Sequence, residues 1–146
     1  MNADEERALA FEVGGVAFAL ALADVREVAE LGELHAVPTL PREIVGVANH
    51  HGDALPVVAP SALLEVGAAA AAREVLVIGG SGDEPPRMGL PVDRVLGLAR
   101  APRSRRDPNG VAPERTTLDG RMLLVLDAAR LLERAESAIA RARRRT

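Results

Sequence analysis

The sequence predicts a mainly β protein, built from two similar small β-barrel lobes and ending in one α-helix. Many short apolar segments follow one another closely, separated by Gly, Pro and Asp, and this pattern is typical of small barrels. A succession of strand, loop, strand and acidic turn occurs twice, in Phe11–Glu30 and in Glu74–Ala99. Because lobes of about 70 residues are marginally stable alone, we expect the two lobes to share apolar contacts.

The N-terminal segment predicts a hairpin followed by a short helix. Leu9–Val13 and Val16–Leu20 are apolar segments on either side of a two-glycine turn, as expected for paired antiparallel strands. Ala23–Glu30 has two valines three residues apart, and Asp24 is a suitable helix cap, so we expect one or two helical turns there. Glu33–Val37 is then expected to return as a strand.

A second hairpin is predicted over Ile44–Ala48 and Ala54–Val58, with the polar tip 50–53, His-His-Gly-Asp, between the two strands. Gly and Asp at the tip favour the positive φ of a tight turn. Prolines and glycines constrain the backbone at four positions around these strands: Pro41, Gly46, Gly52 and Pro56. So many constraints within a short hairpin indicate a surface that presents side chains to a partner.

The second half of the chain repeats this pattern. A helical turn is expected after Pro60, and the alanine run Val66–Ala72 reads as a connecting loop. Glu74–Ile78 and Met88–Val92 predict strands around the exposed loop 79–86. Asp93–Ala99 resembles the earlier acidic segment.

The C-terminal part predicts a loop, a last strand and a helix. Arg100–Arg115 has little apolar content, so we expect a mobile surface loop. Arg121–Leu126 predicts a strand, and Asp127 caps a helix over 127–145. Leu131, Leu132, Ala135 and Ile139 form the apolar face of this helix.

Composition excludes several classes of function. The chain has 48% apolar residues but only two aromatic ones, a net charge of −3 and no cysteine. Base-stacking sites, thiolate metal sites and disulfides are therefore not expected. The basic cluster Arg141–Arg145 is explained by the dipole of a helix C-terminus, so we expect no nucleic-acid partner. Without a visible signal peptide or apolar span, we expect a cytoplasmic protein that does not insert into a membrane.

Catalytic and metal sites are not expected from the residue patterns. The serines lack nucleophile-elbow glycines, and the carboxylates read as turn caps and solvated groups. Adjacent strand residues point to opposite faces, so His50 and His51 are not expected to reach one ion together with Asp53. We therefore expect neither a metal nor another cofactor. A small metal-dependent enzyme using His35, His50 and His51 remains the alternative from another class.

Four segments, in this order, resemble the CheW-like domain family of chemotaxis adaptors, over roughly Leu9–Glu133. They are FEVGGVAFALALADVREV, VPTLPREIVGVANHHGDALPVV, MGLPVDRVLGL and DGRMLLVLDAARLL. The resemblance implies a single domain over 1–146, with two intertwined five-stranded SH3-like β-barrels. Lobe 1 is expected at about 15–65, and lobe 2 at about 73–126 plus the N-terminal strand.

The resemblance also implies a function without catalysis. Family members connect the cytoplasmic tip of chemoreceptors to the regulatory domain of a CheA-type histidine kinase. Val25 and Glu27 match a Val-x-Glu segment linked to receptor contact, and Gly46, Asn49 and Gly52 match the signature hairpin. The expected contact surface is completed by apolar and polar side chains: Val45, Val47, Val92, Val95, His51 and Asp53.

This chain departs from the family at His51, where an arginine is usual. An arginine carries a permanent charge and a planar fork of donors, whereas a histidine is mostly neutral near pH 7. The polar segment Arg100–Arg115 also resembles a shortened version of the family's second-lobe segment. A diverged relative that binds only one of the two partners and modulates the signalling array is therefore the alternative within the adaptor class.

Overall fold

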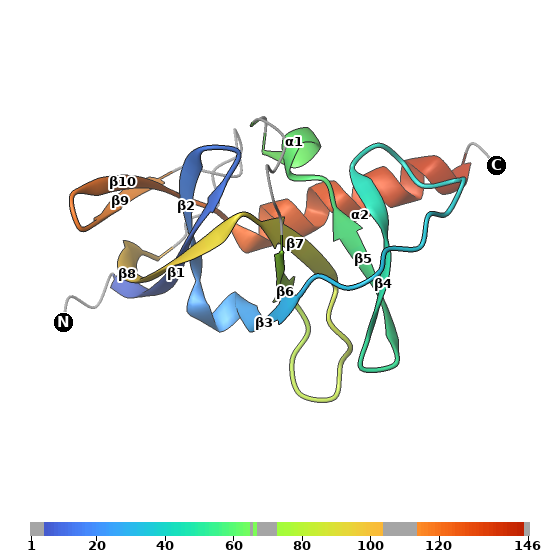
Figure 1. Cartoon of the computed structure of the whole chain (residues 1–146), viewed down its shortest axis with the longest axis horizontal. Coiled ribbons are helices and arrows are strands. Elements are labelled where there is room, and N and C mark those ends of the chain that lie inside the picture. The colour runs from blue at the N-terminus through green and yellow to red at the C-terminus, as the bar shows by residue number, and fades with distance from the viewer. Residues whose placement is uncertain (1–4, 65, 67–72, 104–113, 145–146) are drawn as a thin grey trace.

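The computed structural model describes residues 5–64, 66, 73–103 and 114–144 and contains two five-stranded sheets with a long C-terminal helix (Figure 1). This confirms the predicted mainly β fold with a C-terminal helix. The elements are β1 (Glu5–Val13), β2 (Val16–Ala21), the 3-10 turn η1 (Leu22–Asp24), β3 (Val25–Glu30), β4 (Ile44–His50), β5 (Asp53–Val58), α1 (Pro60–Leu63), β6 (Glu74–Ile78), β7 (Met88–Val92), β8 (Arg94–Pro102), β9 (Glu114–Leu118), β10 (Arg121–Val125) and α2 (Ala128–Arg144).

The two sheets are intertwined because the chain crosses between them twice. One sheet has the order β8-β1-β2-β10-β9 and the other β3-β6-β7-β5-β4. The hairpin β1–β2 lies in the first sheet, and the chain leaves it at Asp24 to form β3 in the second. The hairpin β6–β7 lies in the second sheet, and the chain leaves it at Asp93 to form β8 in the first. The two acidic segments noted in the sequence therefore mark the crossovers.

The expected lobe ranges do not coincide with these sheets. The range 15–65 assigned β2 to lobe 1, but β2 pairs with β1 and β10 in the sheet that also contains β8 and β9. The range 73–126 assigned β6 and β7 to lobe 2, but they pair with β3 and β5. Each hairpin is held locally by its own turn, whereas the choice of sheet depends on contacts far apart in the sequence.

Most of the core lies between the two sheets, in agreement with the expectation that the two lobes share apolar contacts. Successive strand residues point to opposite faces, so β1 directs Leu9 and Phe11 toward a core that also contains Leu76, Leu90 and Leu131 from the other sheet and α2. Buried side chains on the opposite strand faces form one smaller cluster in each sheet. In the first sheet these are Ala8, Ala10, Ala17, Ala19, Ala99, Ala101, Leu123 and Val125, and in the second they are Leu55, Val75 and Val77.

Helix α2 packs against this shared core and confirms the predicted amphipathic helix. The Asp127 carboxylate accepts a hydrogen bond from the backbone N–H of Arg130 at 3.2 Å, so it caps the first turn. The buried residues are Ala128, Leu131, Leu132, Ala135 and Ala138, and Ile139 is half-buried beside them.

Two local expectations were wrong. The segment Ala23–Glu30 is not helical beyond η1, because β3 pairs with β6 over Val25–Glu30 and the backbone hydrogen bonds of the sheet override a weak helical pattern. Glu33–Val37 contributes only an isolated bridge, between His35 and Val47.

Other expectations depend on which residues are described. Most of the alanine run, 67–72, and the centre of the expected loop, 104–113, lie outside the described residues. The two ends of that loop belong to strands β8 and β9.

Candidate partner-binding surface

The tip of the β4–β5 hairpin is a tight turn held by its own side chain. His51 has φ 49° and Gly52 has φ 89°, and two successive positive φ values are typical of a type I′ turn. The Oδ1 atom of Asn49 accepts a hydrogen bond from the backbone N–H of Gly52 at 2.9 Å. Asn49 therefore stabilises the turn. Because the backbone of His51 is left-handed, its ring does not follow the alternation of side chains between the two faces of a strand.

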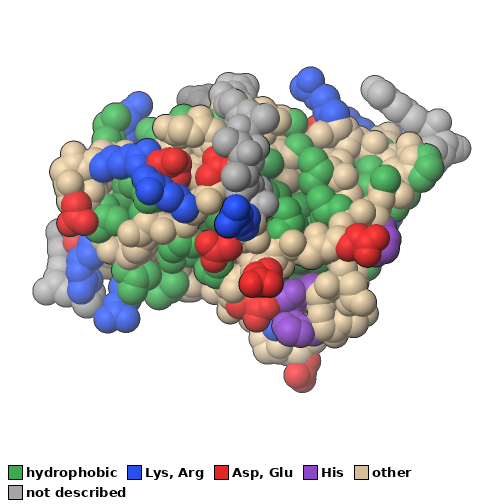
Figure 2. Space-filling model, in the orientation of Figure 1, with side chains coloured by type: hydrophobic (Ala, Val, Ile, Leu, Met, Phe, Trp, Pro, Cys, Tyr) green, Lys and Arg blue, Asp and Glu red, His purple; other side chains and the backbone are tan. Residues whose placement is uncertain are grey.

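Glu27 on β3 reaches this tip and contacts both histidines. Its Oε1 atom lies 3.0 Å from Nε2 of His50 and 3.3 Å from Nε2 of His51. The two imidazole rings are 4.3 Å apart, centroid to centroid. The His50 side chain is only 14% exposed, whereas that of His51 is 76% exposed. Histidine and acidic side chains accordingly lie together over this part of the surface (Figure 2).

The expectation that the adjacent histidines point apart is wrong. It assumed extended backbone at both positions, but His51 lies in the left-handed region, which brings its ring beside that of His50. Among the described residues, Glu27, His50 and His51 form a group whose ligand atoms all lie within 4.8 Å of one another. His35 is not part of this group, so the constellation of three histidines considered for an enzyme is not assembled.

The chain after β3 closes the barrel against β4. His35 and Val47 exchange two backbone hydrogen bonds, of 2.9 Å and 3.0 Å. Gly46 permits this close approach, since a Cβ at that position would lie 3.1 Å from the carbonyl oxygen of His35 and 3.3 Å from Cβ of Leu34. The closure places β3 near the hairpin tip, and we call Glu27, Asn49, His51, Gly52 and Asp53 the tip surface.

The sequence profile of the CheW-like domain matches residues 7–136. This chain belongs to the CheW-like domain family. Its fold is similar to the crystal structure of the scaffolding protein TtCheW from Thermoanaerobacter tengcongensis, with a TM-score of 0.70 and 18% identity over 86% of each chain. No curated protein is similar enough in sequence to count as a relative. The family match supports a chemotaxis scaffold role.

Exposure divides the expected contact residues of this CheW-like domain into three groups. The tip surface is exposed, as is Val45, at 48%. Val25, Val47 and Val95 are half-buried, and Val25 and Val95 pack against the shared core. Gly46 and Val92 are buried, and Val92 has 0% exposure. Neither presents side-chain surface in this structure, and both have packing roles, so their expected contact with a partner stays a prediction.

Several exposed apolar side chains were missed from the sequence. They are Val28, Val37, Leu98 and Met122. Leu98 could have been found, because it lies two residues before the exposed Arg100 on β8 and so shares its outward face. Val28 was overlooked because its segment was interpreted as a helix.

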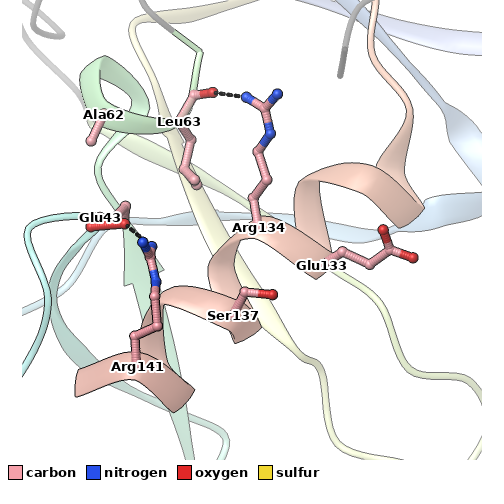
Figure 3. Close-up of a pocket in the computed structure, with 7 residues that line it drawn as sticks. All are labelled: Glu43, Ala62, Leu63, Glu133, Arg134, Ser137 and Arg141. Atoms are coloured by element: carbon pink, nitrogen blue, oxygen red, sulfur yellow. Dashed lines mark hydrogen bonds and ion pairs between the residues drawn. The ribbon is translucent and has the colours of Figure 1, made fainter. Parts of the chain in front are cut away.

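A shallow pocket between α1 and α2 is lined by charged groups that stabilise the fold (Figure 3). Arg141 donates a hydrogen bond to Glu43 at 2.9 Å, and Arg134 donates one to the carbonyl oxygen of Leu63 at 3.4 Å. These contacts connect α2 with α1 and with the start of β4. We therefore interpret the pocket residues as contacts that hold α2 against α1 and β4.

Asp24 lies at the first crossover, near the start of α2. Partial burial raises the pKa of its carboxyl above the ordinary value of 3.8, and the negative charge of Asp127 raises it further. Asp127 is itself 4% exposed and caps α2. The raised pKa thus arises from the packing of the crossover against the helix.

Among the described residues, no helix combines the length and the apolar character needed to cross a membrane.

Proposed function

We propose that this CheW-like domain is a cytoplasmic, non-enzymatic adaptor that couples the cytoplasmic tip of a chemoreceptor to the regulatory domain of a CheA-type histidine kinase. The observation that carries the proposal is the convergence of β3 and the β4–β5 tip on one exposed surface, in a chain that belongs to the CheW-like family. The signature hairpin and the Val-x-Glu segment, which are separate in the sequence, contribute to this same surface.

The tip surface has the composition of a recognition rim. Glu27, His51 and Asp53 supply polar groups, and the exposed Val45 lies on the adjoining strand β4. Protein interfaces combine apolar contact with a polar, solvent-accessible rim, and the rim charges mainly determine specificity and association rate. We propose that this surface contacts one partner, and that the half-buried Val25 and Val95 at the seam between the sheets border the contact with the other.

The direct test measures binding of the tag-free protein to each cognate partner separately. Glu27→Gln removes the carboxylate of the tip surface with little change in size. Asp119→Asn is the matched control, because it neutralises an exposed carboxylate in the β9–β10 turn, and Asn tolerates the φ of 49° found there. We expect the Glu27 variant to weaken binding of at least one partner about tenfold, and the Asp119 variant to bind normally. Parent protein that binds neither the kinase domain nor the receptor tip contradicts the proposal.

A second candidate function is an adaptor that binds only one partner and modulates the array. The observation that favours it is the identity and environment of residue 51. The family usually has an arginine at this position, whereas this chain has His51, whose Nε2 atom lies beside Glu27. An imidazole lacks the planar fork of five donors, so it cannot reproduce a guanidinium contact. Binding of one partner together with failure to activate the kinase distinguishes this candidate from the full adaptor.

A further inference from the structure

Glu27, His50 and His51 present three ligand atoms close enough together to approach one metal ion. The two Nε2 atoms lie 3.0 Å and 3.3 Å from Oε1 of Glu27, and all ligand atoms of the group lie within 4.8 Å of one another. Tetrahedral zinc has bonds of about 2.0–2.1 Å to nitrogen and oxygen, which places neighbouring ligand atoms roughly 3.3 Å apart. Small side-chain adjustments would therefore bring all three atoms onto one ion.

The backbone around these side chains is held by strand pairing and by a turn hydrogen bond. The left-handed turn at His51 and the hydrogen bond from Gly52 to Asn49 hold the hairpin tip. His50 is largely enclosed, and Glu27 projects from a strand fixed by pairing with β6. Because the ligands come from ordered elements that the closed barrel holds together, little conformational entropy is lost when an ion binds.

We propose that Glu27, His50 and His51 form a binding site for a divalent transition-metal ion, for which zinc is the best-matched probe. Two imidazoles and one carboxylate suit zinc and its neighbours, whereas magnesium and calcium prefer shells of oxygen ligands. His51 and Glu27 are exposed, so a fourth coordination position faces solvent and can be filled by water or by a side chain of a partner. This inference does not depend on the adaptor role.

Calorimetric titration of the tag-free protein with zinc chloride tests the site. We expect saturable one-to-one binding in the micromolar range. Glu27→Gln, His50→Gln and His51→Asn should each weaken binding by about tenfold or more, because each removes one ligand. His35→Gln is the matched control, since it removes a histidine outside the group, and it should bind zinc as the parent does.

Cobalt(II) provides a second readout that depends on geometry. Coordination by the two imidazoles and the carboxylate should produce visible absorption bands of four-coordinate cobalt in the parent and in His35→Gln, but not in Glu27→Gln or His51→Asn. Circular dichroism checks that each variant is folded. If His50→Gln unfolds, the test rests on the variants of the two exposed ligands, Glu27→Gln and His51→Asn. Absence of saturable heat at millimolar zinc overturns the proposal. It is also overturned if the three ligand variants bind as the parent does, or if His35→Gln weakens binding equally.

Discussion

Oε1 of Glu27 lies 3.0 Å from Nε2 of His50, although their strands, β3 and β4, form the opposite edges of one five-stranded sheet. The contact is possible because the sheet curls and the chain after β3 bridges to β4 at His35 and Val47. Closing a sheet in this way leaves fewer backbone groups free at its edges. We therefore expect any partner contact at this end of the barrel to use side chains rather than the addition of a strand.

Replacing Gly46 with alanine should destabilise the closure. The added Cβ meets the carbonyl oxygen of His35 and Cβ of Leu34 at 3.1 Å and 3.3 Å, so we expect a loss of about 1–3 kcal/mol. Gly32→Ala is the control, because nothing lies within 4 Å of a Cβ there. Urea unfolding measures both variants. Equal stability of the two would show that Gly46 is not needed for close packing.

Alanine substitutions at Val92 and Val45 should have different effects, the first on stability and the second on partner binding. Val92→Ala removes two fully buried methyl groups from the shared core, so the free energy of unfolding should fall by about 2 kcal/mol. Val45→Ala changes a side chain that is 48% exposed, and should leave stability nearly unchanged while weakening partner binding. Chemical denaturation and calorimetric binding test the pair. A stable Val92→Ala protein with impaired binding would contradict the packing role and support the contact role inferred from the sequence.

Asp24→Asn should alter how stability depends on pH. A carboxyl pKa that is higher in the folded protein favours folding when the group is protonated, and this contribution is lost as the pH rises through the folded pKa. At pH 7 the variant should thus be slightly more stable than the parent, and the difference should disappear below the ordinary pKa of 3.8. Unfolding curves at several pH values measure it. A variant that is less stable at neutral pH contradicts the expected sign.

His51→Arg should change partner affinity while leaving the fold intact. The substitution introduces the guanidinium that is usual in the family, next to Glu27. His51→Asn is the companion variant, because asparagine tolerates the positive φ of the turn but has no ring. Binding to each partner and circular dichroism provide the readouts. Unchanged affinity in both variants would show that position 51 does not contact a partner.

The hairpins were predictable because their information is local. Gly14 and Gly15 lie between two apolar segments, and Gly52 lies at the polar tip, so turn chemistry and β-propensity agreed with the final structure. β3 was misread because its valines also fit a helical spacing and its partner, β6, lies more than forty residues later in the chain. The positive φ of His51 was missed because the turn was placed on Gly52 and Asp53.

The sequence by itself determined the mainly β class, the family, the hairpins and the capped terminal helix, since each depends on neighbouring residues or on an ordered set of motifs. Only the tertiary structure decided which strands share a sheet, that Val92 is buried and that Glu27 meets both histidines. Those relationships arise from barrel closure and from the shared apolar core between the sheets. Both depend on contacts between distant segments, which local propensity and spacing do not encode.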